Sequence, residues 1–350
     1  MLAHPHGALA LGPNTDAKRT SGKDALRIDS LIFLNMANQQ QSTNGHRTHN
    51  MTAPVMDRGY LNIYRRFNDM WRMRLTTNIE ADPNLPGQKV HAYLKYAYLV
   101  GNFSPAMQLI TGLMHTPWIH YEQNLDRHRF ITKCFINSNE FDHSSDAGLG
   151  FRGKLMAGRI GYWVTETVGG GYMDLKRTRG LDFDSRIGFY PSGTSPANGW
   201  TFDLQYRNGF LGKDVAGTLN PSRYQLVQAM TTYTHDDIFR IAAGYVTQHQ
   251  SHYQDQANNN LNTLAFYAWA WDQFTPRFGA YCRYEFRQQH DDIAPATEKK
   301  FHSVLALDYR TSAHLTLALA WDHTAYDNMG LAANATQQNN RYGLYSRIRF

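Results

Sequence analysis

Cationic side chains recur at alternate positions along many short segments of this 350-residue chain. Alternate side chains of an extended strand point to the same face, so each segment would carry its arginines and lysines on one face. Several such faces around an enclosed space attract anions, because a low-dielectric wall focuses their combined charge. The alternative is that individual arginines pair with acids on neighbouring strands. The residues that we expect to form a lumen charge ladder are Arg72, Arg74, Lys95, Arg152, Lys154, Arg207 and Arg283.

A second set of candidate residues lies within 114–145, the longest stretch between strand-like segments. Connections of more than about 12–15 residues are usually functional or disordered. We interpret this one as a loop that folds into the lumen and forms the constriction of a pore, with a packed plug as the alternative. The aromatic and basic side chains that would line the constriction are Trp118, Tyr121, Arg127, Arg129 and Lys133.

Residues for catalysis or metal binding do not stand out. Cys134 and Cys282 lie far apart without metal-ligand spacing, and no Cys-x-x-Cys-His haem attachment site is present. Histidine–acid pairs occur as expected by chance among 16 histidines, and no spacing singles out a catalytic centre. We therefore predict no catalytic residue, no metal and no cofactor. The pairs that an enzyme would need to use are His302 with Asp308, His323 with Asp322, and His235 with Asp236 and Asp237.

The elements that would position these side chains are β-strands. In 200–207, for example, Trp200, Phe202, Leu204 and Tyr206 alternate with polar residues. No run of 18 or more apolar residues exists, which argues against a transmembrane helix, whereas a barrel strand needs only about 9–11 residues. The sequence therefore predicts an all-β fold, an antiparallel transmembrane β-barrel of about 16 strands. These strands would start near residues 26, 58, 70, 89, 106, 146, 159, 181, 199, 222, 237, 260, 276, 300, 313 and 340.

Short and long connections alternate between these segments, with turns such as 68–69 and 235–236 and links such as 37–56 and 289–299. Bacterial barrels alternate short periplasmic turns with long extracellular loops. We expect two parts, a flexible periplasmic segment over 1–24 and the barrel over 25–350. A signal peptide would be expected and is not visible, so either a leader was removed or the start is wrongly assigned. The net charge of +6 is spread along the chain, which argues against a nucleic acid partner.

The final segment, 341–350, carries an apolar face that ends in Phe350 and a cationic face opposite it. It resembles the closing strand of bacterial outer-membrane barrels, in which the terminal Phe helps the barrel-assembly machinery to recognise the chain. That resemblance implies a Gram-negative bacterium, outer-membrane lipid around the barrel, and Phe350 as the assembly signal.

Four motifs resemble the porin O and P group of outer-membrane porins. They are 91–99 (HAYLKYAYL), 112–118 with its Thr-Pro-Trp, 146–154 (DAGLGFRGK) and 169–172 (GGGY), and 58–63 also fits. The resemblance implies a 16-stranded trimeric diffusion channel whose third loop folds inward. Phosphate selectivity in that group rests on a cluster of lysines in this loop, whereas 114–145 contains only Lys133.

These observations predict an outer-membrane porin, a passive channel for small hydrophilic solutes and ions with a weak anion preference. One alternative is a channel specific for an anion such as phosphate or for a sugar. The alternative of another class is a barrel hydrolase.

Overall fold

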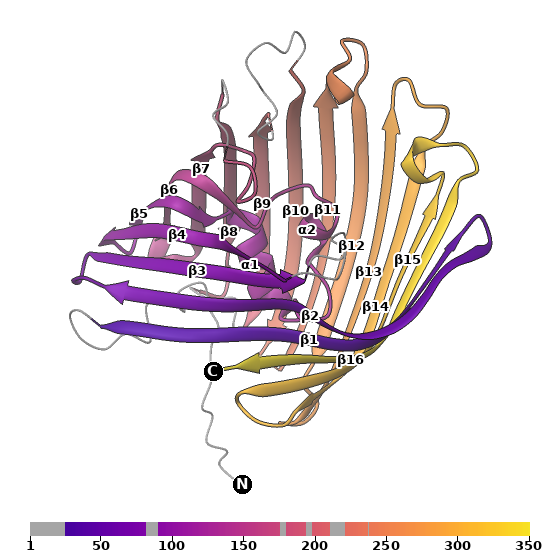
Figure 1. Cartoon of the computed structure of the whole chain (residues 1–350). Coiled ribbons are helices and arrows are strands. Elements are labelled where there is room, and N and C mark those ends of the chain that lie inside the picture. Colours follow the sequence, from indigo (N-terminus) through magenta and orange to yellow (C-terminus); the bar gives the residue numbers. More distant parts are fainter. Residues whose placement is uncertain (1–24, 82–89, 176–179, 194–197, 211–220, 237) are drawn as a thin grey trace.

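The computed structural model describes residues 25–81, 90–175, 180–193, 198–210, 221–236 and 238–350. The expected flexible segment 1–24 therefore lies outside the described residues. Sixteen antiparallel strands form one closed barrel in which each strand pairs with its neighbours in the sequence, and β1 pairs with β16. Figure 1 shows this order, with the indigo β1 lying beside the yellow β16. The predicted 16-stranded barrel is confirmed.

The strands of the first half of the barrel are β1 (Leu26–Thr43), β2 (His46–Arg66), β3 (Trp71–Ala81), β4 (Val90–Ser104), β5 (Met107–His115), β6 (Ser145–Leu155), β7 (Ile160–Thr167) and β8 (Asp182–Phe189). Those of the second half are β9 (Gly199–Gly209), β10 (Arg223–His235), β11 (Phe239–Ser251), β12 (Leu261–Asp272), β13 (Phe278–Asp291), β14 (Glu298–Arg310), β15 (Leu315–Asp327) and β16 (Thr336–Arg349). Two α-helices, α1 (Pro117–Asp126) and α2 (Phe135–Ser138), lie between β5 and β6. Single 3₁₀ turns follow β6, β11 and β15, at Met156–Gly158, Tyr253–Asp255 and Met329–Leu331.

The two faces of the strands differ as the alternation predicts. In β9, Trp200 and Leu204 are about half exposed, while Asp203 and Gln205 on the other face are buried. The apolar face points outward and the polar face points into the barrel. The closing strand follows the same rule: Phe350 is 70% exposed on the apolar face, and its N–H donates to the Ser30 carbonyl oxygen at 3.1 Å. Backbone pairing between β16 and β1 thus continues to the last residue.

The predicted loop 37–56 is wrong. β1 continues to Thr43 and β2 begins at His46, so a two-residue turn replaces the expected long link. Asn44 and Gly45 both have positive φ, 49° and 79°, as the tight turn of a two-residue hairpin requires. The Gln- and Asn-rich composition suggested a loop, but the Asn-Gly pair was the stronger signal. The polar composition also misled the prediction for β16: its start was expected near residue 340, but the strand begins at Thr336.

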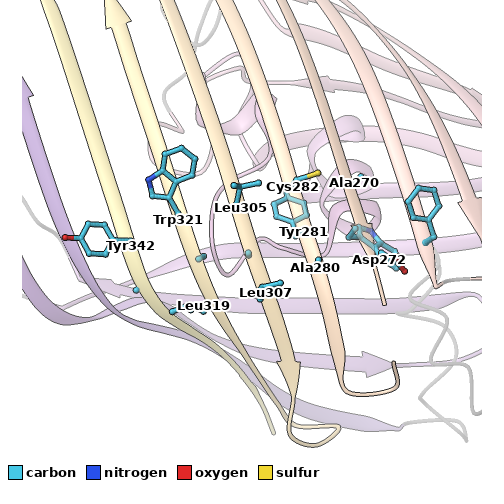
Figure 2. Close-up of a pocket in the computed structure, with 15 residues that line it drawn as sticks. Ala270, Asp272, Ala280, Tyr281, Cys282, Leu305, Leu307, Leu319, Trp321 and Tyr342 are labelled. Atoms are coloured by element: carbon cyan, nitrogen blue, oxygen red, sulfur yellow. The ribbon is translucent and has the colours of Figure 1, made fainter. Parts of the chain in front are cut away.

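The outward face contains a hollow of about 750 Å³ over β11 to β16. Small side chains, Ala270, Ala280 and Cys282, form its floor, and Leu305 and Trp321 stand beside them (Figure 2). Its lining is almost entirely carbon, so it is part of the apolar surface and does not belong to a polar solute path. Among the described residues, no helix combines the length and the hydropathy that crossing a membrane requires.

Candidate functional site

The segment 116–144 is an ordered structure and not an open loop. Helix α1 starts with Pro117 at its first position, where a missing N–H costs no hydrogen bond. It ends at Arg127, which has the left-handed φ of 66° and donates its N–H to the Gln123 carbonyl oxygen. These two ends fix a helix of 10 residues within a connection that the sequence predicted only as a loop.

The apolar side chains of this segment pack against the inward face of the second half of the barrel. Trp118 and Phe135 are fully buried, and the Phe135 ring stacks on Tyr267 of β12 at a centroid distance of 4.6 Å. Tyr121 is 3% exposed and donates its hydroxyl to Asp203 Oδ2 at 2.7 Å. Trp118 and Tyr121, which the sequence placed at the constriction surface, are therefore buried packing residues in this structure.

Inward-facing side chains also donate hydrogen bonds to the main-chain carbonyl oxygens of 116–144. Such bonds position the backbone of the segment itself. The donors and acceptors are Arg240 Nη1 and Trp271 Nε1 to Leu125 (2.9 and 2.8 Å), Arg347 Nη1 to Arg127 (3.1 Å), Arg341 Nη2 to Ile131 (2.8 Å), Arg283 Nη1 to Lys133 (2.6 Å) and Tyr224 Oη to Phe141 (2.6 Å). Strands β10 to β13 and β16 thus hold the segment.

Two members of the predicted charge ladder, Arg207 and Arg283, help to hold 116–144 against the wall of the barrel. Arg207 is buried and pairs with Asp142 of the segment and with Asp182 of β8, at 3.1 Å from Asp182 Oδ2. Arg283 is buried and pairs with Glu285 while it donates to the carbonyl oxygen of Lys133. Their charges are compensated, so for these two residues the alternative of paired arginines is the better interpretation.

Other ladder residues point inward on the opposite side of the barrel. Arg74 lies between the rings of Tyr64 and Tyr96, at 5.1 and 4.9 Å from their centroids, and Arg152 lies 4.8 Å from the Trp163 ring. Aromatic faces hold these guanidinium groups in place. Arg72 lies with Arg74 along a narrow crevice, and Lys154 is partly buried at the end of β6.

A cavity of about 300 Å³ lies between 129–133 and the wall strands β2 and β16. Its cationic lining consists of Arg58, Arg129, Lys133 and Arg341, and Asp57 is its one carboxylate. Arg58 forms an ion pair with Glu80 at 3.4 Å, and Arg341 pairs with Asp322 at 3.1 Å.

Arg129 and Lys133 differ from the other two cations of this cavity. Within the described part of the chain, neither of them forms an ion pair or a hydrogen bond through its side chain. The pKa of each is lowered, first by removal from bulk water and then by the repulsion of Arg58. Of these two causes, the repulsion of Arg58 is the one that reflects a positive potential at both side chains. We call Arg58, Lys95, Arg129, Lys133 and Arg341 the cationic cluster.

Lys95 joins this cluster because of a β-bulge in β4. Thr76 of β3 pairs with Tyr96 and Thr77 pairs with Leu94, so Lys95 is the extra residue. A bulge lets two successive side chains point to the same side. Lys95 and Tyr96 are accordingly both buried inside, at 1% and 6% exposure.

Arg127, the remaining predicted constriction residue, lies elsewhere. Its guanidinium stands 4.6 Å from the Trp271 ring, in a small cavity that it shares with Asp308, Arg310 and Arg347. The structure therefore brings Arg129 and Lys133 together and separates them from Arg127.

Arg58 and Arg341 are not among the site residues predicted from the sequence, although both follow the inward alternation of their strands. Tyr172, whose ring centroid lies 3.4 Å from Lys95 Nζ, was not predicted either. The triple glycine before Tyr172 was the available signal for a close approach of this chain segment.

Of the three histidines that an enzyme would need, His235 does lie near its predicted partner, 3.8 Å from Asp236 Oδ2, with both side chains exposed. Asp237 lies outside the described residues. The other two histidines have different partners. Both ring nitrogens of His302 lie 3.0 Å from carboxylates, those of Glu285 and Asp322, so neither is free to activate a hydroxyl. Asp308, the partner expected for His302, instead binds His128. His323 lies on the outward face, stacked on Trp321. In the described ranges, no group of three or more His, Cys, Asp or Glu side chains has a geometry that would hold a metal ion.

No family model matches the chain, and no curated protein matches it. Solved structures of bacterial outer-membrane barrels do resemble it. The anion-selective porin from Comamonas acidovorans has 11% identity and a TM-score of 0.66, over 94% of this chain and 100% of that one. The outer-membrane expressed OmpT of Vibrio cholerae has 11% identity and a TM-score of 0.65, over 95% and 99% of the two chains.

Salmonella typhi OmpF in complex with daunomycin also resembles the chain, with 11% identity and a TM-score of 0.62 over 93% and 98% of the two chains. At these identities the likeness establishes the fold. The closed barrel, its apolar outward face and these neighbours support the location in a bacterial outer membrane that the sequence predicted. The chain therefore has the fold of a porin-like outer-membrane barrel.

Proposed function

We propose that this protein is a porin, a passive and non-enzymatic channel of the outer membrane that prefers small anions, and that 116–144 narrows its lumen. The observation that carries the proposal is the cationic cluster, in which Arg129 and Lys133 face a cavity without a carboxylate partner among the described residues. An uncompensated positive potential in a narrow passage raises the local concentration of anions and repels cations. The anion-selective porin among the structural neighbours is consistent with this preference.

The course of 116–144 supports its role as a constriction. The segment packs against β10 to β15 and leaves the cationic cluster on its other side, towards β2, β4 and β16. Where the segment narrows the lumen to less than the Debye length of about 8–10 Å, screening of the cluster is incomplete. The in-vitro folded OmpT of Vibrio cholerae, another structural neighbour, is in trimer form, which supports a homotrimer. The motif resemblance supports a place in the porin O and P group. Recognition of Phe350 by the assembly machinery is part of the same proposal.

A planar bilayer under a salt gradient tests the proposal directly. The wild-type channel is expected to give a reversal potential on the anion side. Replacing Arg129 and Lys133 together by Glu is expected to move the reversal potential to the cation side. A matched control, Arg223→Glu with Lys299→Glu, makes the same change of charge on exposed outward-facing positions of β10 and β14 and is expected to leave the potential unchanged. Equal shifts in the two double variants would exclude the cluster as the selectivity site.

The other two candidate functions predict different results in the same experiment. A channel specific for a phosphate-like anion or a sugar would show wild-type conductance that one solute blocks and that saturates at a far lower concentration of this solute than of other solutes. A barrel hydrolase would show no conductance. The occupied ring nitrogens of His302 favour the channel over the hydrolase.

A further inference from the structure

The segment 168–175, which follows β7, reaches across to β4. Gly169 and Gly171 have positive φ values of 88° and 70°, and the Gly169 N–H donates to Asp146 Oδ2 at 2.8 Å. A Cβ atom on Gly171 would lie 2.6 Å from the His143 ring, so a larger residue does not fit there. The two glycines let the chain pass tightly over the end of 116–144 and place Tyr172 against Lys95 of the cationic cluster.

Tyr172 covers Lys95. Its ring stacks on the ring of Tyr93 at a centroid distance of 5.3 Å and an interplanar angle of 11°. Lys95 Nζ lies 3.4 Å from the centroid of the Tyr172 ring, and the lysine is only 1% exposed. Tyr93 is itself fixed, because its hydroxyl donates to Glu80 Oε1 at 2.7 Å. The ammonium group of Lys95 therefore meets an aromatic face where other cations of the cluster meet a cavity.

An aromatic face stabilises a desolvated ammonium group, but less strongly than an anionic oxygen does. A small oxoanion or carboxylate in the cluster would thus compete with Tyr172 for Lys95. We propose that Tyr172 is a specificity-determining lid, which shields Lys95 and lowers the affinity of the cluster for small oxoanions. This inference rests on the proposed anion channel. A lid of this kind weakens the binding of an anion, so the anion leaves the cluster quickly, as passage through a channel requires.

The alternative is that Tyr172 only occupies space at the entrance of the passage and has no specific effect on Lys95. In that case its removal widens the passage for every ion, whether or not Lys95 is present. If Tyr172 is a lid, the effect of removing its ring depends on the charge of Lys95. A double-mutant comparison separates the two, because it isolates the coupling between the ring and the lysine.

The experiment measures single-channel conductance against inorganic phosphate concentration, together with the reversal potential, for purified full-length barrels. Tyr172→Leu is expected to lower the phosphate concentration at half-saturation about fivefold and to increase the anion preference. Tyr172→Phe keeps the aromatic face and is expected to behave as the wild type. In a Lys95→Met background, Tyr172→Leu is expected to have no effect on either quantity.

The result that overturns the lid is an unchanged half-saturation in Tyr172→Leu, or a change of equal size with and without Lys95. A wild-type channel without anion preference would instead refute the proposed function, so the two failures are distinguishable. Circular dichroism of each variant confirms a folded barrel. If Tyr172→Leu does not fold, Tyr172→Met replaces it, and the same outcomes apply.

Discussion

His128 fastens 116–144 to the wall of the barrel, and its titration is expected to control how firmly the segment is held. Its Nε2 lies 2.6 Å from Asp308 Oδ2 of β14, its Nδ1 lies 2.7 Å from the Asp126 carbonyl oxygen, and its ring stacks on Tyr281 at 4.0 Å. Burial lowers the pKa of His128, but the charge of Asp308 and the hydrogen bonds to Asp126 and Asp308 outweigh burial and raise it to about 9.

The folded-state pKa of His128 lies above its ordinary value of 6.5, so the charged form stabilises the fold. This contribution is fully present below pH 6.5 and is lost as the pH rises through about 9. At about 1.4 kcal/mol for each pH unit between the two values, the full contribution is about 3 kcal/mol.

The measurement is the free energy of unfolding in detergent micelles between pH 6 and pH 10, for the wild type and for His128→Gln. Glutamine keeps an N–H donor for Asp308 but does not titrate, so the stability of the variant is expected to fall less over this range. The difference between the two curves isolates His128 from tyrosines and lysines that titrate nearby. Parallel curves for the two proteins would refute the reasoning.

Three further predictions concern the segment, the outer face and the orientation. Burial raises the pKa of Glu122 to about 8, so its stabilising contribution is present below pH 4.5 and is lost as the pH rises through 8; unfolding of Glu122→Gln should lack this component. Leu319→Arg, on the outward face, should cost about 2–4 kcal/mol of folding free energy in lipid, whereas Thr324→Arg on the inward face should fold normally. Asp69→Cys, in the turn between β2 and β3, should not react with an impermeant thiol reagent on whole cells, and rapid labelling there would reverse the predicted orientation.

The strands were predictable because their alternation is local. A face of β9 such as Trp200, Phe202 and Leu204 needs only neighbouring residues to be recognised, and lipid outside a closed barrel requires it. The closing strand with Phe350 was predictable for the same reason. The link 37–56 was misjudged because composition was given more weight than Asn44-Gly45, a turn signal that the sequence also contained.

The roles of the inward arginines could not be predicted, because they depend on the path of a segment far away in the sequence. Arg283 is 150 residues from Lys133, yet it donates to the carbonyl oxygen of Lys133. A cue for this packing was present in β12, where Tyr267 and Trp269 make the inward face as apolar as the outward one. An apolar inward face indicates that something packs against it inside the barrel.

A comparison of Arg207 with Lys133 tests whether the inward cations have two different roles. Some would hold 116–144 in place, and others would face the solute. Arg207 is buried between Asp142 and Asp182, so Arg207→Gln leaves two carboxylates without their partner. Breaking a buried pair in this way typically costs about 3–5 kcal/mol, and the segment held through Asp142 is expected to lose its fixed position. The channel should then become noisy and unstable.

Lys133 forms no ion pair in the part of the chain that the structure describes, so Lys133→Gln should leave the free energy of unfolding unchanged within about 0.5 kcal/mol. It should nevertheless reduce the anion preference measured by the reversal potential. Each replacement removes one positive charge, so a ladder of equivalent cations would respond alike to both. Equal shifts of the reversal potential without loss of stability would show that Arg207 also faces the solute. The total charge of the lumen, and not the cationic cluster alone, would then set the anion preference.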